Sequence, residues 1–199
     1  MSTTTSSNLP SILELDINNI NLTDEQFFML CQNNPDLRFE RTASGELIIM
    51  PPTGGITGDR NSDLNYQLRG WSRKNKLGKT FDSSTGFKLP NGANRSPDAS
   101  WVKMERWNTL TEDEQEKYIP LCPDFVVELM SPSDTLEKTR AKMKEYMDNG
   151  ATLGWLINRK QQQIEIYRPN QEVEIINFPQ TVSGEDVLPG FVLDLTEIW

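Results

Sequence analysis

The chain has 199 residues, of which 20 are basic and 29 acidic, and its net charge of −9 accompanies 36% hydrophobic residues, a balance typical of a folded protein with a polar surface. The absence of histidine excludes Ser-His-Asp triads, Cys-His proteases, and zinc sites or general bases built on histidine. Only two cysteines, Cys31 and Cys122, are present, so a metal ion would need oxygen ligands, which suit Mg²⁺, Mn²⁺ or Ca²⁺.

The amino-terminal part of the chain is predicted to contain a disordered segment, a short helix and a hairpin. The polar sequence MSTTTSSNLP predicts disorder over residues 1–10, followed by a single domain over residues 11–199. Thr23 or Asp24 is expected to cap the helix, and apolar alternation on both sides of Gly45 predicts a β-hairpin. No secretory signal and no run of about 18 apolar residues is visible, so we expect a cytoplasmic protein with no membrane partner.

The middle of the chain carries most of the positive charge. Residues 38–106 have a net charge of +5, whereas the segments before and after them are acidic. Leu64, Leu68 and Trp71 follow a helical period, which predicts a helix over residues 60–76. Six bases fall on this helix or just after it: Arg60, Arg69, Arg73, Lys74, Lys76 and Lys79. This basic cluster is either a solvated helix face or a strip that contacts phosphate groups.

Strands and helices alternate in the second half of the chain. Strands are predicted over residues 80–89 and 97–104, followed by a short acidic helix at TEDEQEKYI. The most apolar strand, PDFVVELM over residues 123–130, is expected to be buried on both faces. A helix capped by Ser133 or Asp134 follows, and then the strands LGWLIN, QIEIYRP and VEIINF. This order predicts an α/β (α+β) fold with a central mixed β-sheet flanked by helices.

Two acidic residues have the character of site residues. Asp98 lies at the start of a predicted strand, and Glu128 lies inside the most apolar strand, where an unpaired carboxylate is costly. Glu128 therefore requires a partner, which is either a lysine or arginine side chain or a metal ion. On neighbouring strands, Asp98 and Glu128 can share one divalent ion, with the backbone carbonyl of Leu129 as a further oxygen ligand.

The helix after Glu128 supplies the nearest bases. On a helical projection, Lys142 and Lys144 flank the apolar stripe on opposite sides, and Tyr146 is the i+4 neighbour of Lys142. Each of these two lysines either extends along the edge of the core or points its ammonium group toward the end of the preceding strand. Lys138 projects away from the stripe and is expected to be solvated.

The spacing of the two acids resembles the arrangement of PD-(D/E)XK nucleases. In that arrangement a lysine stands two positions after the second acid, where this chain has Met130. The longer stretch from PDFVVELMSPSD through QIEIYRP, with GELIIMPPTGG and RSPDASWV upstream, is similar to the Uma-two-type family of restriction-endonuclease-like proteins. The segment PDFVVELMSPSD and the K-x-x-x-Y spacing of Lys142 and Tyr146 are the most specific parts of this similarity. The resemblance runs from about residue 24 to the C-terminus and implies a restriction-endonuclease-like fold with a modified catalytic set.

The resemblance also implies roles for individual residues. Asp98 and Glu128 are expected to bind the metal ion, and Lys142 is expected to be the catalytic lysine, moved to the following helix. Three further positions come with the resemblance: Glu46 and Asp63 are candidates for an additional acid, and Asn158 stands where family members often carry aspartate, with no catalytic role expected.

The expected function is a metal-dependent endonuclease that hydrolyses phosphodiester bonds in DNA, with Mg²⁺ or Mn²⁺ as cofactor and a homodimer as the expected assembly. Such chemistry needs a water nucleophile and relief of negative charge, which a divalent ion and an ammonium group can supply without histidine. The alternative is a catalytically inactive or regulatory binding module on the same scaffold, which Met130 and the net acidity favour. A third possibility is a structural homodimer with no ligand.

Overall fold

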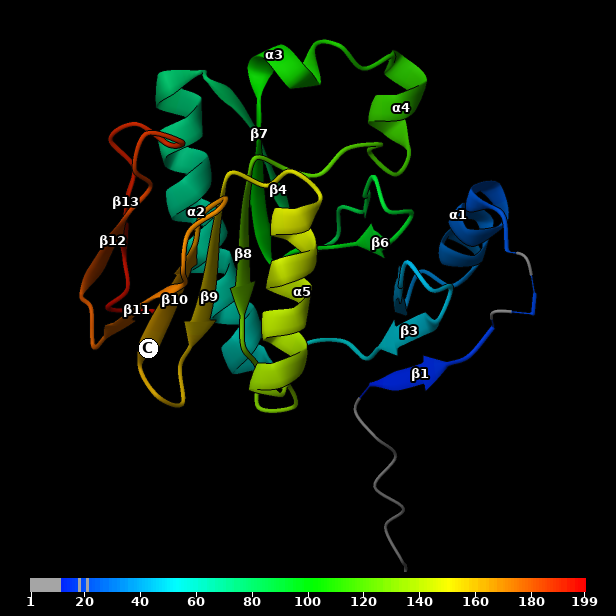
Figure 1. The fold of residues 1–199 in the computed structure, drawn as a ribbon, viewed down its shortest axis with the longest axis horizontal. Helices are drawn as coiled ribbons and strands as arrows, with labels where there is room; N and C mark the ends of the chain where they lie inside the picture. Colours follow the sequence, from blue (N-terminus) through cyan, green and yellow to red (C-terminus); the bar gives the residue numbers. More distant parts are fainter. Residues whose placement is uncertain (1–11, 18, 21) are drawn as a thin grey trace, which may run out of the picture.

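Two large β-sheets form the framework of the molecule (Figure 1). The computed structural model describes residues 12–17, 19–20 and 22–199. The first sheet has five antiparallel strands in the order β1 (Leu13–Leu15), β3 (Leu47–Met50), β2 (Arg38–Arg41), β6 (Asn94–Arg95) and β5 (Phe87–Lys88). The second sheet has six strands in the order β11 (Glu174–Asn177), β10 (Gln163–Tyr167), β9 (Leu153–Asn158), β8 (Phe125–Leu129), β7 (Ala99–Lys103) and β4 (Gly78–Asp82).

Helices cover both faces of the six-stranded sheet (Figure 1). The helices of the described residues are α1 (Asp24–Asn33), α2 (Gly55–Asn75), α3 (Met104–Trp107), α4 (Glu112–Glu116) and α5 (Leu136–Asp148). Leu64 and Leu68 of α2 pack on one face of the sheet, and Met143 and Tyr146 of α5 pack on the other. A small hairpin of β12 (Thr181–Ser183) and β13 (Val192–Asp194) completes the layer on the α2 side.

The β8–α5–β9 unit positions the most apolar strand. β8 pairs with β9 in parallel, as expected when a helix crosses between two strands of one sheet, whereas the other neighbouring strands of this sheet are antiparallel. All five residues of β8 are buried, which confirms that this strand is covered on both faces. Because side chains alternate along a strand, Phe125 and Val127 face α2, while Val126 and Glu128 face α5.

The predicted hairpin at the start of the chain is confirmed. β2 and β3 pair in antiparallel register on either side of Gly45, whose φ of 95° is a conformation that glycine adopts without strain. Along β2, Phe39 packs with Phe27 of α1, and Glu40 points to the opposite face. That opposite face is turned toward the six-stranded sheet, so Glu40 comes within reach of Lys142 on α5.

Several predicted boundaries are wrong. The expected strand over residues 80–89 is two strands, β4 and β5, in different sheets, because a turn in which Asp82 accepts hydrogen bonds from Ser84 separates them. The helix expected from residue 60 begins at Gly55 and ends at Asn75, where Lys76 takes a left-handed conformation. The cap of α5 is neither Ser133 nor Asp134 but Thr135, whose hydroxyl accepts the Lys138 N–H.

The structure does not test two expectations about the chain as a whole. The predicted disordered segment over residues 1–10 lies outside the described residues, and the single domain over residues 11–199 stays a prediction. In the part of the chain that the structure describes, no helix has the length and apolar character needed to cross a membrane.

Candidate functional site

A cleft of about 900 Å³ lies between the two sheets. One wall comes from β2, β3 and the segment 51–57, and the other comes from the end of β8, the segment 131–134 and α5. These walls can be followed in Figure 1, where β1 and β3 stand on one side and α5 on the other. Asp98, Glu128 and Lys142, the three residues predicted to be catalytic, all line this cleft.

Asp98 is held in place by hydrogen bonds from β8 and α2. Its Oδ2 accepts the backbone N–H of Leu129 at 2.9 Å, and its Oδ1 accepts the Asn61 side-chain amide at 3.2 Å. The Asn65 side chain also donates to the Asp98 backbone carbonyl at 2.9 Å, so α2 fixes this residue at two points. Burial raises the pKa of Asp98, although the Leu129 N–H and the charges of Lys142 and Arg38 oppose that shift.

Glu128 projects from β8 toward α5 and meets two residues of that helix. Its Oε1 accepts the Tyr146 hydroxyl at 3.0 Å and lies 2.9 Å from the Lys142 ammonium nitrogen. Burial raises the pKa of Glu128 to about 7; Lys142 opposes this shift, whereas the carboxylates of Asp98 and Glu40 add to it. The polar partner that the sequence required for Glu128 is therefore a lysine together with a tyrosine.

Lys142 reaches the site because of its position on α5. Lys142 and Tyr146 are separated by one helical turn, so both side chains reach the same carboxylate. Burial lowers the pKa of Lys142, but the carboxylates of Glu128 and Glu40 raise it by more, and the result is a pKa above the ordinary value. Lys144 is exposed and pairs with Asp148, which shows that only one of the two flanking lysines faces the sheet.

Glu40 and Arg95 complete an ion network that the sequence did not reveal. The Lys142 nitrogen lies 2.8 Å from Glu40 Oε1, and Arg95 contacts Glu40 at 3.1 Å and Glu145 at 2.6 Å. Glu40 also accepts the Ser96 N–H at 3.0 Å and is only 3% exposed. Burial raises the pKa of Glu40, but Lys142 and Arg95 lower it by more, so its pKa is below the ordinary value. The alternation of side chains along LRFERT predicts that Glu40 and Phe39 lie on opposite faces of the strand. It does not predict that the face bearing Glu40 packs against α5.

Replacing Glu40 with glutamine is expected to lower the free energy of unfolding at neutral pH by about 3–5 kcal/mol, because Arg95 and Lys142 lose a buried counter-charge. The folded-state pKa of Glu40 is depressed, so its contribution is present above the unfolded-state pKa and is lost as pH falls through the folded-state value. Urea titrations of both proteins should therefore show a difference that shrinks in acid. A difference that stays constant with pH would contradict this role of the charge.

The other predicted positions lie apart from this network. Glu46 lines the cleft but is exposed and bonds to Thr42 and Ser44 of its own turn. Asp63 accepts a hydrogen bond from Gln67 on α2. Asn158 bonds to Gln161 in the turn after β9, and the lack of a catalytic role there stays a prediction. Leu129 contributes its N–H to Asp98, and metal binding by its carbonyl stays a prediction.

The basic cluster lies mainly on the carboxyl-terminal half of α2. Asn61 lies in the amino-terminal part of α2 and lines the cleft. Arg73 is twelve residues further along the helix, which at 1.5 Å per residue places it about 18 Å away along the helix axis. Arg69 donates to Thr80, and Arg60 donates to the carbonyl of Trp199. The structure thus places most of this cluster well away from the three predicted catalytic residues, and phosphate contact there stays a prediction.

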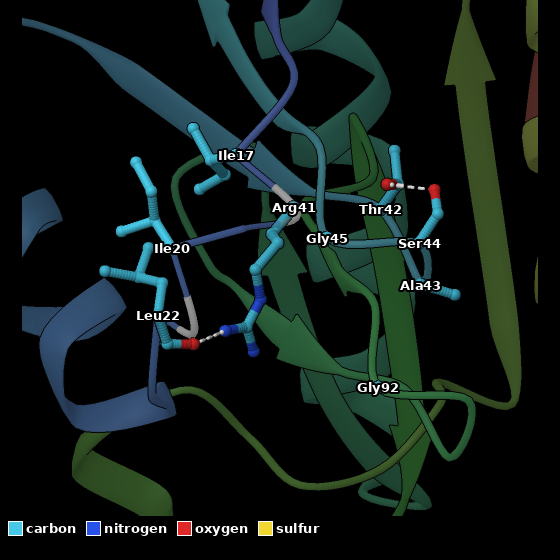
Figure 2. Close-up of a pocket in the computed structure, with 9 residues that line it drawn as sticks. All are labelled: Ile17, Ile20, Leu22, Arg41, Thr42, Ala43, Ser44, Gly45 and Gly92. Atoms are coloured by element: carbon cyan, nitrogen blue, oxygen red, sulfur yellow. Dashed lines mark hydrogen bonds between the residues drawn. The ribbon is translucent and has the colours of Figure 1, made fainter.

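A smaller cavity of about 260 Å³ lies behind the β2–β3 hairpin (Figure 2). Among the described residues that line it, the ionisable one is Arg41, which donates to the Leu22 carbonyl at 2.7 Å and pairs with Asp24. Figure 2 shows the hydrogen bond from Arg41 to the Leu22 carbonyl and the hydrogen bond between the Thr42 and Ser44 hydroxyls in the turn. Because Arg41 is engaged on both sides, the described residues around this cavity offer no set of groups for chemistry.

The donor set of the larger cleft fits a divalent cation that prefers oxygen. Within the described ranges, no group of three or more acidic or cysteine side chains is arranged to hold a metal ion. Asp98 and Glu128 would therefore hold one as a pair, and Mg²⁺ is commonly bound by one or two carboxylates together with waters. No salt bridge neutralises Asp98 among the described residues, and Glu128 shares its lysine with Glu40. A buried carboxylate and a half-buried one, both incompletely neutralised, suit such an ion.

The comparisons with known proteins agree with the predicted fold and family. The sequence matches the model of the Uma2 family, described as "Putative restriction endonuclease", over residues 24–196. The structure is similar to one from Anabaena variabilis ATCC 29413, described as "a putative nuclease belonging to DUF820". The two share 20% sequence identity with a TM-score of 0.68, and the match covers 80% of this chain and 88% of that chain, which confirms the fold. No curated protein matches the sequence. Since the family model spans most of the sequence, the chain belongs to the Uma2 family.

Proposed function

We propose that this protein is a metal-dependent endonuclease that hydrolyses phosphodiester bonds in DNA. The observation that carries the proposal is the meeting of the Lys142 ammonium group with Glu128, 2.9 Å away, in the same cleft as Asp98. These residues come from α5, from β8 and from the position just before β7, and all three line one cleft although Met130 occupies the usual lysine position. The lysine required by the chemistry is supplied from the helix.

Each of the three residues has a distinct part in the proposed reaction. Asp98 and Glu128 would hold the divalent ion, and their hydrogen bonds to Leu129 and Tyr146 orient the two carboxylates before an ion or substrate arrives. Such an ion supplies Lewis acidity toward the phosphate and the attacking water. Lys142, ion-paired with two carboxylates, carries the positive charge that can stabilise negative charge developing on the phosphate.

A plasmid-cleavage assay tests the proposal. Purified protein is expected to nick or linearise supercoiled plasmid with Mg²⁺ or Mn²⁺ and to leave it intact with a chelator. Asp98→Asn should lower the cleavage rate by about 100-fold or more, as loss of a group that stabilises the transition state does. Asp63→Asn is the matched control, because Asp63 bonds to Gln67 on α2 and does not line the cleft.

The outcomes separate the proposed function from the alternative. Equal cleavage by wild type and Asp98→Asn, purified in the same way, would show that cleavage does not depend on this site and would contradict the proposal. Tight binding of DNA without cleavage under any of these conditions would instead favour a regulatory binding module. The homodimer also stays a proposal, and sedimentation of the purified protein measures it directly.

A further inference from the structure

The cations of the cleft are not equivalent. Four basic side chains line it, and three of them are paired with carboxylates of the protein. Lys142 pairs with Glu40 and Glu128, Arg95 with Glu40 and Glu145, and Lys138 with Glu14 at 2.6 Å. The fourth is Arg38, which forms no ion pair with any carboxylate in the part of the chain that the structure describes. Among these four cations, Arg38 is therefore the one whose charge no carboxylate of the described residues offsets.

Arg38 is also held in a defined position. Its Nη2 donates to the backbone carbonyl of Ser83 at 2.6 Å, which leaves the other guanidinium donors without a protein acceptor in the described residues. Arg38 and Glu40 are two positions apart on β2 and so project from the same face of that strand, the face turned toward the catalytic residues. Arg38 also acts electrostatically on the carboxylate of Asp98.

We propose that Arg38 binds a backbone phosphate of the nucleic-acid strand, next to the phosphate that is hydrolysed. The proposal rests on the proposed function and adds the group that holds the strand. A planar guanidinium binds a phosphate through two parallel hydrogen bonds, and the Ser83 carbonyl fixes its orientation. Carboxylates outnumber cations among the residues lining the cleft, so a polyanion needs a free cation there in order to enter.

Binding measurements on Arg38→Gln test this role without depending on turnover. Fluorescence anisotropy of a labelled DNA duplex, and of each of its single strands, is measured in Ca²⁺ over a range of salt concentrations. Loss of a charge-assisted contact is expected to raise the Kd about tenfold. The slope of log K against log salt should fall by about 0.9 for the duplex or about 0.7 for a single strand. Lys144→Gln is the control, because this lysine lies outside the cleft and pairs with Asp148.

Each outcome decides the proposal. An unchanged Kd and slope for Arg38→Gln would overturn it, and would leave the proposed function intact if the wild type still cleaves plasmid. A loss of slope in Arg69→Gln and Arg73→Gln, but not in Arg38→Gln, would overturn it in favour of the basic cluster. A wild type that neither binds nor cleaves DNA would overturn both proposals.

A second variant covers the case in which Arg38→Gln does not fold. Arg38→Lys keeps one positive charge but loses the two parallel donors, so its salt slope should match the wild type while its Kd rises. Thermal melts of both variants establish that they are folded at the assay temperature. If Arg38→Lys binds DNA with wild-type affinity, the paired contact to phosphate is refuted.

Discussion

Replacing Lys142 with alanine is expected to lower the rate of DNA cleavage by about 100-fold or more, the loss typical when a charge-stabilising or proton-transferring group is removed. The ammonium group of Lys142 touches Glu128 and Glu40, so no other described side chain can take over its position without moving. Single-turnover rates at saturating protein concentration are the measurement, because they separate the chemical step from weaker binding of DNA.

The control for Lys142→Ala must account for stability. Removing this lysine leaves two carboxylates without their shared counter-charge, which costs about 3–5 kcal/mol when an ion pair is buried. Thermal melts therefore accompany the rates, and Lys142→Arg retains the positive charge for comparison. Lys144→Ala, on the exposed side of the same helix, should change stability by no more than about 0.5 kcal/mol and leave the rate unchanged. A folded Lys142→Ala protein with wild-type turnover would refute the assignment.

The second large effect is expected in metal binding. Asp98→Ala and Glu128→Gln should each weaken the binding of Mn²⁺ measured by calorimetry at least about tenfold, because loss of groups that merely orient metal ligands already costs about 10–100-fold. Without metal, Glu128→Gln should be no less stable than the wild type, since burial and the neighbouring carboxylates disfavour the charge of Glu128.

Two further variants define what this result means. Asp63→Asn should bind Mn²⁺ as the wild type does, because Asp63 lies on α2 and bonds to Gln67. Glu46→Gln tests the additional acid implied by the family resemblance, since Glu46 lines the cleft but bonds only to its own turn. Equal affinity of wild type, Asp98→Ala and Glu128→Gln for Mn²⁺ would show that these two carboxylates do not form the metal site.

The local pattern of the sequence was sufficient to predict one half of the site. The apolar run of β8 and the amphipathic period of α5 predicted the unit that carries Glu128 and Lys142. The helical projection allowed either Lys142 or Lys144 to face the sheet, because both flank the buried stripe. The family resemblance selected Lys142, and its contacts with Glu128 and Glu40 confirm that it is the lysine that faces inward.

The other half could not be predicted, because it depends on contacts between distant segments. Glu40 meets Lys142 and Arg95 across 102 and 55 positions of sequence, respectively. Strand alternation shows which side chains share a face, but not which face packs against another sheet. For the same reason, the pattern does not show that β4 and β5 join different sheets, although the polar residues 82–86 between them form a turn.

The contact between Glu40 and Lys142 also links the site to the β2–β3 hairpin of the smaller, five-stranded sheet, whose hydrophobic cluster is separate from those of the six-stranded sheet. Glu40 belongs to the hairpin of β2 and β3, whereas Lys142 belongs to the helix packed on the six-stranded sheet. Regions of a protein can open locally at a lower free-energy cost than global unfolding. Detachment of that hairpin would leave the main core folded while releasing Lys142 from one of its two carboxylates. Loss of activity on heating would then precede the main melting transition, and substitutions far from the catalytic residues, along the hairpin, would change thermal inactivation before they change the melting temperature.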